Sequence, residues 1–297
     1  MEPKSINPPL IVIVGQTASG KTSLSLELAR QFNGEIIAAD SRTIYEGMDI
    51  STAKPTPAER ALIRHHLLDV TTPDKMFSAA EFQRQANEAI AGINARGKAA
   101  FLVGGSGLYV DAVLYDFAFQ GKADPVLRNE LQQLPVEELQ GRLSKQGIAL
   151  PSNSRNPRHL VRALETKGSV GQRSGLRPNT LVLGLDVDRE IISRNITQRV
   201  ATMLDQGLVS EIKQVAEQYG WDAPGLQTPG FKAFRAYFEG AASLEEASER
   251  FMASDRHLSK RQRTWFRRNP DIHWICKKDE AVDAITTFLN KESTAYD

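Results

Sequence analysis

The sequence predicts an α/β protein with a parallel-sheet core and a helical insertion. Strand-like and helix-like segments alternate over the first hundred or so residues, which is typical of a parallel sheet covered by helices. After about residue 118 the chain becomes polar and leucine-periodic, which indicates helices, and strand-like sequence returns at 180–187. The 297 residues are 41% hydrophobic and 25% charged, as expected of one large globular domain or a domain with a sizeable insertion.

Three apolar segments are the predicted core strands of the first part of the chain. They are "LIVIV" (10–14), "GEIIAAD" (34–40) and "KAAFLVGGSG" (98–107). Short, nearly continuous apolar runs rich in β-branched residues are typical of strands that helices cover on both faces. We therefore expect these three segments to form the centre of the sheet.

Two helices are expected between these strands. "KTSLSLELARQF" (21–32) places its large apolar side chains on one helical stripe. "FSAAEFQRQANEAIAGINARG" (77–97) begins with a capping box formed by Ser78 and Glu81. Both segments are long enough to cover a sheet of short strands.

The second part of the chain is mostly helical. Residues 124–148 and 189–268 read as helices, with a second capping box at Ser243 and Glu246, and "DIHWIC" (271–276) reads as a last strand before a terminal helix. The predicted segments are 1–118 for the first part of the core, 119–178 for a mainly helical segment, 179–204 for a core strand and helix, 205–255 for a helical insertion, and 256–297 for a basic helix with the last core elements.

Composition limits the kinds of protein that fit. The net charge is +1, so any contact with nucleic acid must come from local basic patches. Cys276 is the one cysteine, which excludes an internal disulfide and a cysteine-rich zinc site, and we expect it to pack within the last strand. The first ten residues lack a signal-peptide pattern and no apolar run reaches membrane-spanning length. A soluble, cytoplasmic protein is expected.

The segment "GQTASGKT" (15–22) predicts a phosphate-binding loop. It matches G-x-x-x-x-G-K-[ST] and lies between a predicted strand and a predicted helix, as this motif requires. Its glycines let backbone N–H groups point inward, Lys21 adds a cation, and Thr22 is placed to bind Mg²⁺. The predicted phosphate- or diphosphate-binding residues are Gly15, Gln16, Thr17, Ala18, Ser19, Gly20, Lys21 and Thr22. The predicted core is therefore P-loop NTPase-like.

A carboxylate follows the second predicted strand. An ATPase usually has an aspartate after an apolar strand to hold Mg²⁺ near the γ-phosphate, but here the strand 99–103 ends in "GGSG". Asp40 is the candidate instead, because the ends of parallel strands meet at one edge and Asp40 should face the phosphate loop. It could orient a metal-bound water, accept a proton from an acceptor group, or only terminate a turn.

Seven segments occur in the order found in one enzyme family. They are "GQTASGKT", "ADSRTIYEGMDISTAKP", "HHLLDV", "FSAAEF", "LVGGSGLYVDAVL", "NPRHLVRALE" and "SKRQRTWFRR". From about residue 10 to about residue 275, the chain resembles bacterial tRNA dimethylallyltransferases, also called tRNA isopentenyltransferases. "DSRTIYEGMDI" and "KRQRTWFRR" carry the resemblance more specifically than the phosphate loop does.

The resemblance implies transfer of a dimethylallyl group from its diphosphate to N6 of adenosine 37, beside the anticodon of tRNA. The phosphate loop would then hold a diphosphate carried by a prenyl chain, with Mg²⁺ and Lys21 neutralising the leaving group. Asp40 would act as the base near N6. Ser106 matches a position that is usually threonine and touches the target adenosine. Arg199 would face the diphosphate; by sequence alone it could equally pair with a nearby acid.

Basic helices are the predicted RNA-facing parts. Within 254–268, Arg256, Lys260, Arg263 and Arg267 recur at helical spacing, which indicates either a solvated face or RNA contact. In "NPRHLVRALE", Asn156 caps a helix whose leucine and valine side chains pack inward. The resemblance implies tRNA contacts at Asp40, Ser41, Arg42, Thr43, Ser106, Arg128, Arg158, His159, Leu160, Val161, Arg162, Lys260, Arg261, Gln262, Arg263 and Arg267. The adenosine would be extruded to reach Asp40, with the prenyl diphosphate entering from the opposite side.

Two departures and two alternatives accompany this interpretation. Pro229–Gly230–Phe231 replaces the usual I-G-Y in a presumed tRNA-contact region, and Ser51 replaces the glycine of the usual G-T-A-K. His65 and His66 lack a further ligand at a supporting spacing, so no metal site is expected there. A small-molecule kinase that uses ATP would leave the basic stripe unused, and an RNA-binding protein without activity would leave the phosphate loop without purpose. The expected form is a monomer that binds tRNA and dimethylallyl diphosphate and no membrane.

Overall fold

The computed structural model describes residues 8–119, 124–169 and 172–293, and divides the chain into two compact units. Unit 1 contains Met1–Tyr115 and Leu176–Asp297, and unit 2 contains Asp116–Gly175. The sequence placed the corresponding boundaries at 119 and 178. In unit 1, the backbone N–H of Arg177 donates to the carbonyl of Leu114 at 2.7 Å, so the two chain ends that flank unit 2 are joined to each other.

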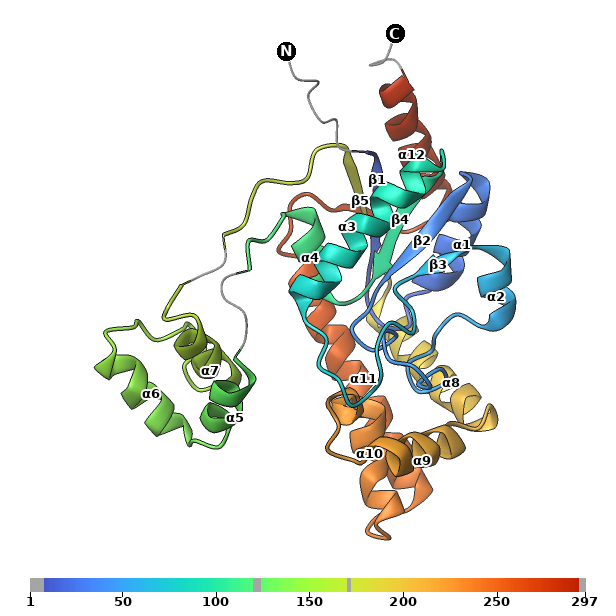
Figure 1. The fold of residues 1–297 in the computed structure, drawn as a ribbon. Coiled ribbons are helices and arrows are strands. Elements are labelled where there is room, and N and C mark those ends of the chain that lie inside the picture. Colours follow the sequence, from blue (N-terminus) through green and yellow to red (C-terminus); the bar gives the residue numbers. More distant parts are fainter. Residues whose placement is uncertain (1–7, 120–123, 170–171, 294–297) are drawn as a thin grey trace. The chain divides into compact units, whose positions relative to one another are not determined.

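Unit 1 is built on a six-stranded parallel sheet in the order β3-β2-β4-β1-β5-β6 (Figure 1). The strands are β1 (Leu10–Val14), β2 (Gly34–Ala39), β3 (His65–His66), β4 (Ala99–Gly104), β5 (Thr180–Leu185) and β6 (His273–Ile275). Val14 lies opposite Gly104 on one side and Gly184 on the other, and Ala39 also lies opposite Gly104. The loops that follow β1, β2 and β4 therefore begin at the same level of one sheet edge.

The structure confirms the predicted strands and adds one. β1 is buried along its whole length, as its continuous apolar sequence predicts. The added strand, β3, has only two residues, which is too short to give a periodic pattern. The expectation for Cys276 is wrong: it lies one residue beyond β6 and is exposed, whereas Ile272 and Ile275 are the buried residues of this segment.

Helices pack against the strands of the sheet. α1 (Lys21–Gln31) and α12 (Lys278–Ser293) share one apolar cluster with Ile11, Phe101 and Leu183 of the strands. α3 (Ala79–Ala95) packs on β2 and β4 and crosses the front of the sheet in Figure 1. It contacts α4 (Gly107–Leu114) through the stacked rings of Phe82 and Tyr109, whose centroids are 4.3 Å apart.

Of the two predicted capping boxes, the one at Ser243 forms completely, whereas the one at Ser78 forms only its serine half, because the Glu81 carboxylate binds other side chains. Ser243 and Glu246 form both hydrogen bonds of a capping box. Ser78 caps α3 by accepting from the N–H of Glu81, while the Glu81 carboxylate accepts from Arg84 and Gln85 on the helix surface. The short helix α2 (Pro57–Leu62) has a further capping box, which the sequence interpretation did not include.

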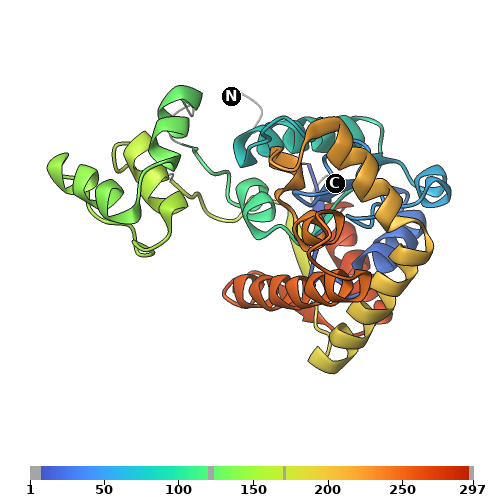
Figure 2. The ribbon, with the colours of Figure 1, turned by 90° about the horizontal axis from the view of Figure 1, so that it is seen from below.

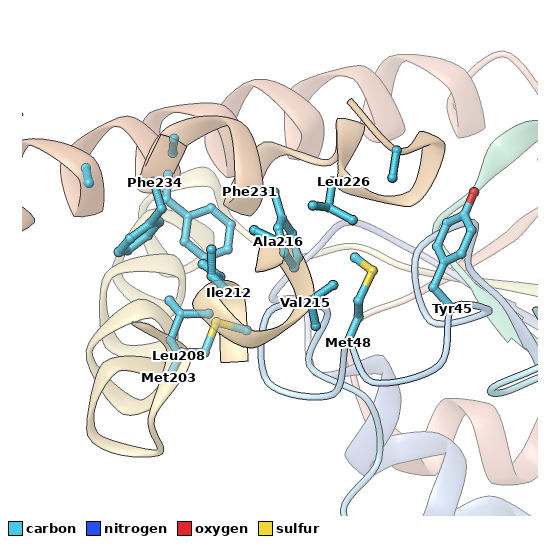
Figure 3. Close-up of a cluster of buried hydrophobic side chains, with 14 of the residues drawn as sticks. Tyr45, Met48, Met203, Leu208, Ile212, Val215, Ala216, Leu226, Phe231 and Phe234 are labelled. Carbon is cyan, nitrogen blue, oxygen red and sulfur yellow. The ribbon is translucent and has the colours of Figure 1, made fainter. Parts of the chain in front are cut away.

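A second apolar cluster joins the helical part of unit 1 to the loop after β2. The helices are α8 (Arg189–Asp205), α9 (Leu208–Tyr219), the 3-10 turn η1 (Pro224–Gln227), α10 (Pro229–Phe238) and α11 (Leu244–Phe266), which lie together in Figure 2. Met48 of the loop lies beside Val215 of α9, and Tyr45 belongs to the same cluster, which also contains Phe231 of α10 (Figure 3). The loop that carries Asp40 is thus anchored on a rigid helical layer.

Unit 2 is a small helical domain. Its helices are α5 (Pro125–Gln132), α6 (Val136–Lys145) and α7 (Pro157–Glu165), and its core consists of Leu131, Leu139, Leu143, Leu160, Val161 and Leu164. Asn156 caps α7 by accepting from the N–H of Arg158, as predicted. Across the described parts of both units, no helix combines the length and apolar character needed to cross a membrane.

Candidate active site

The segment 15–22 is a loop after β1 that continues into the first two residues of α1, at the edge of the sheet where the strands end. Gly20, the residue before α1, has φ of 86°, a left-handed conformation that favours glycine. Asn195 of α8 fixes the loop by donating to the carbonyl of Ala18 at 3.0 Å. Backbone N–H groups at the start of α1 and the charge of Lys21 thus gather at one point, as an anion site requires.

Lys21 is folded back onto its own loop. Its ammonium group donates to the Gln16 carbonyl at 2.5 Å. Burial lowers the pKa of Lys21 to about 8; the nearby Asp40 carboxylate opposes this shift and Arg199 adds to it. The lysine is still cationic at neutral pH, and a bound anion would stabilise that charge.

Helix α11 holds the phosphate loop from behind. Gln262 accepts from the N–H of Thr17 at 2.7 Å and donates to the carbonyl of Gly105 at 3.0 Å. Gln16 donates to the hydroxyl of Ser259 at 2.9 Å. Gln262, which is predicted to contact tRNA, is buried, and its amide group binds two backbone groups. In the structure it therefore connects the loops after β1 and β4.

Asp40 lies at the end of β2 and faces the phosphate loop, as predicted. One carboxylate oxygen accepts from the N–H of Arg42 at 3.0 Å, which makes Asp40 also a turn residue. The other oxygen has no hydrogen-bond partner within the described residues. The two roles that the sequence left open are compatible, because the turn uses one oxygen and leaves the second available.

Ser106 joins the ends of β2 and β4. Its hydroxyl accepts from the N–H of Ser41 at 2.9 Å and lies 3.2 Å from the Ser41 hydroxyl. This places Ser106 beside the loop that carries Asp40. The sequence motifs "ADSRT" and "GGSG" therefore form one surface, although they are more than 60 residues apart.

The glycines around Ser106 are explained by contacts within the protein. A Cβ at Gly104 would lie 2.0 Å from the carbonyl oxygen of Ala39, which the sheet register holds in place. A Cβ at Gly107 would lie 2.5 Å from the Trp265 ring. Both positions require glycine because protein atoms approach the backbone closely.

Arg199 of α8 points into the site without an ion pair. Its Nε is buried and has no hydrogen-bond partner in the described structure. Burial lowers the pKa of Arg199, and the charge of the fully buried Asp255 is the largest opposing influence. One oxygen of Asp255 lies 3.5 Å from Arg42 and the other has no partner in the described structure. The alternative in which Arg199 pairs with an acid within 4.0 Å is therefore not seen, and its guanidinium is available to an anion.

Two cavities meet at Asp40. The inner cavity, of about 250 Å³, is lined by the phosphate loop from Thr17 to Thr22, Asp40 and Arg199. The outer cavity, of about 370 Å³, is lined by Ser106, Trp265 and others. Residues common to both are Asp40, Arg42, Gly105 and Gln262. A third cavity meets the inner one at Ala53, Pro55 and Arg199, so the inner cavity can be approached from two directions.

The inner cavity can accept a metal ion that a phosphate ligand brings with it. Thr22 and Asp40 both line it, and Mg²⁺ bound through phosphates needs only one or two protein oxygens. No group of three His, Cys, Asp or Glu side chains suited to a metal occurs among the described residues. His66 instead lies 2.7 Å from Glu35, and His65 lies 2.8 Å from the Ile63 carbonyl oxygen.

Glu211 is a site-supporting residue that the sequence did not reveal. This carboxylate of α9 accepts from three successive backbone N–H groups, those of Asp49, Ile50 and Ser51, at 2.8, 2.6 and 2.8 Å. The loop that it holds continues to Thr52 and Ala53, which line the inner cavity. No local signal could have found this contact, because it links residues about 160 positions apart.

Comparison with known proteins identifies the family. The family model described as IPP transferase matches residues 43–269. A tRNA dimethylallyltransferase of Bacillus pumilus is 40% identical over 288 residues, which are 92% of this chain and 91% of the relative. This chain belongs to the IPP transferase family. A Roseiflexus tRNA dimethylallyltransferase is 43% identical over 281 residues, covering 89% of this chain and 92% of that protein.

Solved structures of IPP transferases confirm the P-loop NTPase-like fold. The full-length tRNA isopentenylpyrophosphate transferase of Bacillus halodurans is 36% identical, with a TM-score of 0.75 over 97% of this chain and 99% of its own. A eukaryotic dimethylallyltransferase acting on tRNA has a TM-score of 0.77 and 28% identity, over 91% of this chain and 74% of that chain. The predicted fold and family are thus confirmed, whereas the roles of individual residues stay predictions.

Helix α11 of this family member presents two different faces. Arg256 and Lys260 line a cavity of about 560 Å³ together with Arg189 of α8, while Arg261 and Trp265 line the outer cavity. Arg256 donates to the hydroxyls of Ser193 and Thr197. Neither Lys260 nor Arg261 has an ion pair in the described structure.

The predicted basic stripe is partly neutralised at its C-terminal end. Asp186, just after β5, lies 2.5 Å from Arg267 and 3.7 Å from Arg263. The Arg267 guanidinium also lies over the ring of Trp274, 4.0 Å from its centroid. The sequence alone does not reveal this partner, because the fold brings Asp186 to the stripe from about 80 residues away.

In unit 2 the predicted RNA contacts divide by burial. Leu160 and Val161 are buried in the core of unit 2, so their side chains pack and are not exposed to RNA. Arg128 makes a two-point ion pair with Glu165, at 2.5 and 2.7 Å. Arg158 and His159 are exposed, and with the half-exposed Arg162 they remain the predicted contacts of this helix.

The two departures from the family pattern have structural explanations. Phe231 is fully buried in the second apolar cluster, near the start of α10, so Pro229–Gly230–Phe231 belongs to the core and its side chain at 231 is not exposed to RNA. Ser51 is buried, with its N–H bound to Glu211 and its hydroxyl unpartnered in the described structure. The bond to Glu211 uses only the backbone, so glycine and serine can both make it.

Proposed function

We propose that this protein transfers a dimethylallyl group from dimethylallyl diphosphate to N6 of adenosine 37 in tRNA and releases diphosphate. The observation that carries the proposal is the position of Asp40, which lines both the inner and the outer cavity. A diphosphate held at the phosphate loop and a base held beside Ser106 would meet at this carboxylate. The names of the relatives and of the solved structures support this assignment over the alternatives.

The leaving group would be held in the inner cavity. N–H groups of the phosphate loop, Lys21 and Arg199 supply positive charge where charge develops as the C1–O bond breaks and its electron pair passes to the diphosphate. Thr22 would hold Mg²⁺, and the ion would supply further neutralisation of the leaving group. Because Lys21 and Arg199 are buried, they act in a low-dielectric site where this stabilisation is strong.

The acceptor would be held in the outer cavity. N6 of adenine is a weak nucleophile, so its attack on C1 requires loss of a proton as the N–C bond forms. The oxygen of Asp40 that the turn leaves available would take that proton. Ser106, which is tied to Ser41, would position the base. The adenosine must leave its stack to reach this depth, as in other enzymes that modify bases.

The two alternatives explain less of the structure. A kinase would need an acidic residue at the end of β4 or its equivalent, but Gly104 is closed against the backbone of Ala39 and leaves no room for a side chain. An RNA-binding protein without activity would have no use for a buried lysine and arginine beside a free carboxylate. The proposed enzyme works on tRNA in the cytoplasm as a monomer.

Nucleoside mass spectrometry tests the proposal. Unmodified tRNA is incubated with the protein, Mg²⁺ and either dimethylallyl diphosphate or ATP, and phosphate products are followed together with modified nucleosides. The expected result is N6-(dimethylallyl)adenosine at position 37 with equimolar diphosphate, only in the first reaction. ATP turnover without prenylated adenosine would establish the kinase, and RNA binding without either product would establish the inactive binding protein.

A further inference from the structure

Trp265 lines the outer cavity but has no part in the proposed chemistry. It is 43% exposed, one of the few large apolar side chains open to solvent in the described structure. Asp40 and Ser106 line the same cavity. An exposed tryptophan beside a proposed base-binding site needs a physical explanation, because an indole ring is normally at least largely buried.

The indole is fixed in place at one end. Its Nε1 donates to a carboxylate oxygen of Asp111 in α4 at 3.1 Å. Its five-membered ring also lies directly on Gly107, where a Cβ would approach Cδ1 and Nε1 to 2.5 Å. The ring is thus held in one orientation before any ligand binds.

Trp265 differs from the other two tryptophans of the chain. Trp221 packs against Phe238, with ring centroids 5.7 Å apart, and the Trp274 ring is covered by Arg267. Trp265 has neither an aromatic nor a guanidinium partner within the described residues. A held, partly exposed and unstacked ring is the arrangement by which proteins bind single-stranded bases.

The surroundings of Trp265 suit RNA. Leu258, Arg261 and Trp265 recur on one face of α11 and line the outer cavity, with exposed Leu108 nearby in the same lining. Arg261 has no ion pair in the described structure, so its charge is available to a phosphate. The combination of an aromatic ring with an unpaired cation beside it fits a nucleotide.

We propose that Trp265 is a stacking platform for a nucleobase that flanks the extruded adenosine. This rests on the proposed function, since extrusion removes the adenosine from between its two neighbours and exposes their faces. The indole would replace part of the stacking that one neighbour loses. Stacking on an aromatic side chain changes affinity by about 5- to 150-fold per base.

A binding cycle between protein and RNA tests the platform. Binding of anticodon stem-loop RNA is measured for the wild type and Trp265→Leu, without prenyl donor. Each protein is tested with an intact RNA and with two abasic RNAs. One lacks the base on the 5′ side of the target adenosine, and the other lacks the base on its 3′ side. Trp265→Leu is expected to weaken binding of the intact RNA by about 5- to 150-fold and to weaken binding of one abasic RNA much less.

A purely structural role for Trp265 gives a different result. If the indole only supports Gly107 and Ser106, Trp265→Leu weakens binding of all three RNAs by the same factor, and the platform is excluded. Leu108→Ala is the matched control, because it removes apolar surface from the same cavity without removing a ring and should show no dependence on the flanking base. Trp265→Phe keeps a ring and should retain part of that dependence.

Two further measurements keep the outcome clear. Binding of inorganic diphosphate reports whether Trp265→Leu preserves the phosphate loop. In a Trp221→Phe, Trp274→Phe protein, Trp265 is the one remaining source of indole fluorescence. Intact RNA should quench it, and the abasic RNA that lacks the stacked base should quench it less. Equal quenching by all three RNAs contradicts the platform. Because none of these measurements involves prenyl transfer, a platform that fails and an enzyme that fails are distinguishable.

Discussion

The Lys21 ammonium nitrogen lies 2.5 Å from the carbonyl oxygen of Gln16, five residues earlier in the same loop. The lysine side chain therefore folds back onto the backbone of its own loop. No carboxylate in the described structure forms an ion pair with it. Burial holds its pKa at about 8. A buried cation without an acidic partner is stabilised by an anionic ligand, which links the binding of that ligand to protonation.

Diphosphate affinity is expected to fall as pH rises through about 8. Below that pH Lys21 is protonated in the free protein, and above it each binding event must also restore the proton. Titration calorimetry with inorganic diphosphate and Mg²⁺ between pH 7 and pH 10 measures the effect. Lys21→Arg, which stays charged, is the control and should lack the part of the pH dependence that comes from the lysine. Identical profiles would remove Lys21 from the site.

Asp40→Asn is expected to slow prenyl transfer by about 10²–10⁴-fold while binding of both substrates changes little. The amide keeps an oxygen that can accept from the N–H of Arg42, so the turn survives and only the proton acceptor is lost. Single-turnover assays with saturating enzyme isolate this step. Ser41→Ala, which alters the neighbouring exposed hydroxyl, is the comparison variant. Near-normal transfer by Asp40→Asn would leave Asp40 a positioning role at most.

The salt dependence of tRNA binding should separate the cations of α11. Lys260→Ala is expected to lower the slope of log affinity against log salt by about 0.7–0.9, the effect of one lost phosphate contact. Arg267→Ala should lower it less, since Asp186 and the Trp274 ring already hold that guanidinium. Equal changes in the two variants would mean that RNA displaces the Asp186 pair, and unchanged slopes would mean a solvated face.

A buried charge network predicts the behaviour of the fold in acid. Burial alone would raise the pKa of Glu35, but hydrogen bonds from Arg96, His66 and Lys98 outweigh it and lower the pKa to about 2. The carboxylate therefore stabilises the fold above its unfolded pKa of about 4.5, and this stabilisation disappears as pH falls towards 2.

Glu35→Gln should accordingly have a lower free energy of unfolding at pH 7, measured by denaturant titration. The loss should be at most about 3 kcal/mol, since Arg96 and Lys98 are partly exposed. The difference from the wild type should shrink between pH 4.5 and pH 2. Glu81→Gln, at an exposed ion pair of α3, serves as the control and should change stability by less than about 1 kcal/mol. A deficit for Glu35→Gln that persists at pH 2 would assign the loss to packing.

Local sequence was enough to predict the parts of the site that depend on local structure. The phosphate loop, the strand before it and the helix after it follow from chain-neighbour chemistry, and the edge at which Asp40 meets them follows from parallel strands. β3 was missed because two residues carry no period. The requirement for glycine at 104 could not be predicted, because the Ala39 backbone lies against it only in the folded sheet.

Charge partners were the least predictable feature. Asp186 neutralises Arg267 from another strand end, and Glu211 binds a loop far from it in sequence. Such contacts depend on which elements the fold brings together, and one sequence contains no pattern that identifies them. The buried Asp255 beside Arg42 is a third case, which helical periodicity marks only as an inward position.

The bond between Leu114 and Arg177 gives unit 1 its own closure. This hydrogen bond of 2.7 Å holds the two chain ends that flank unit 2 close enough for a short turn to connect them. Unit 2 is therefore an insertion that unit 1 does not need to close its own chain. A chain with a few glycine and serine residues in place of 116–175 should keep the circular dichroism and diphosphate binding of unit 1. Unit 2 could in turn be exchanged between relatives as one segment. RNA specificity would then be changed without altering the residues proposed to carry out prenyl transfer, which lie in unit 1.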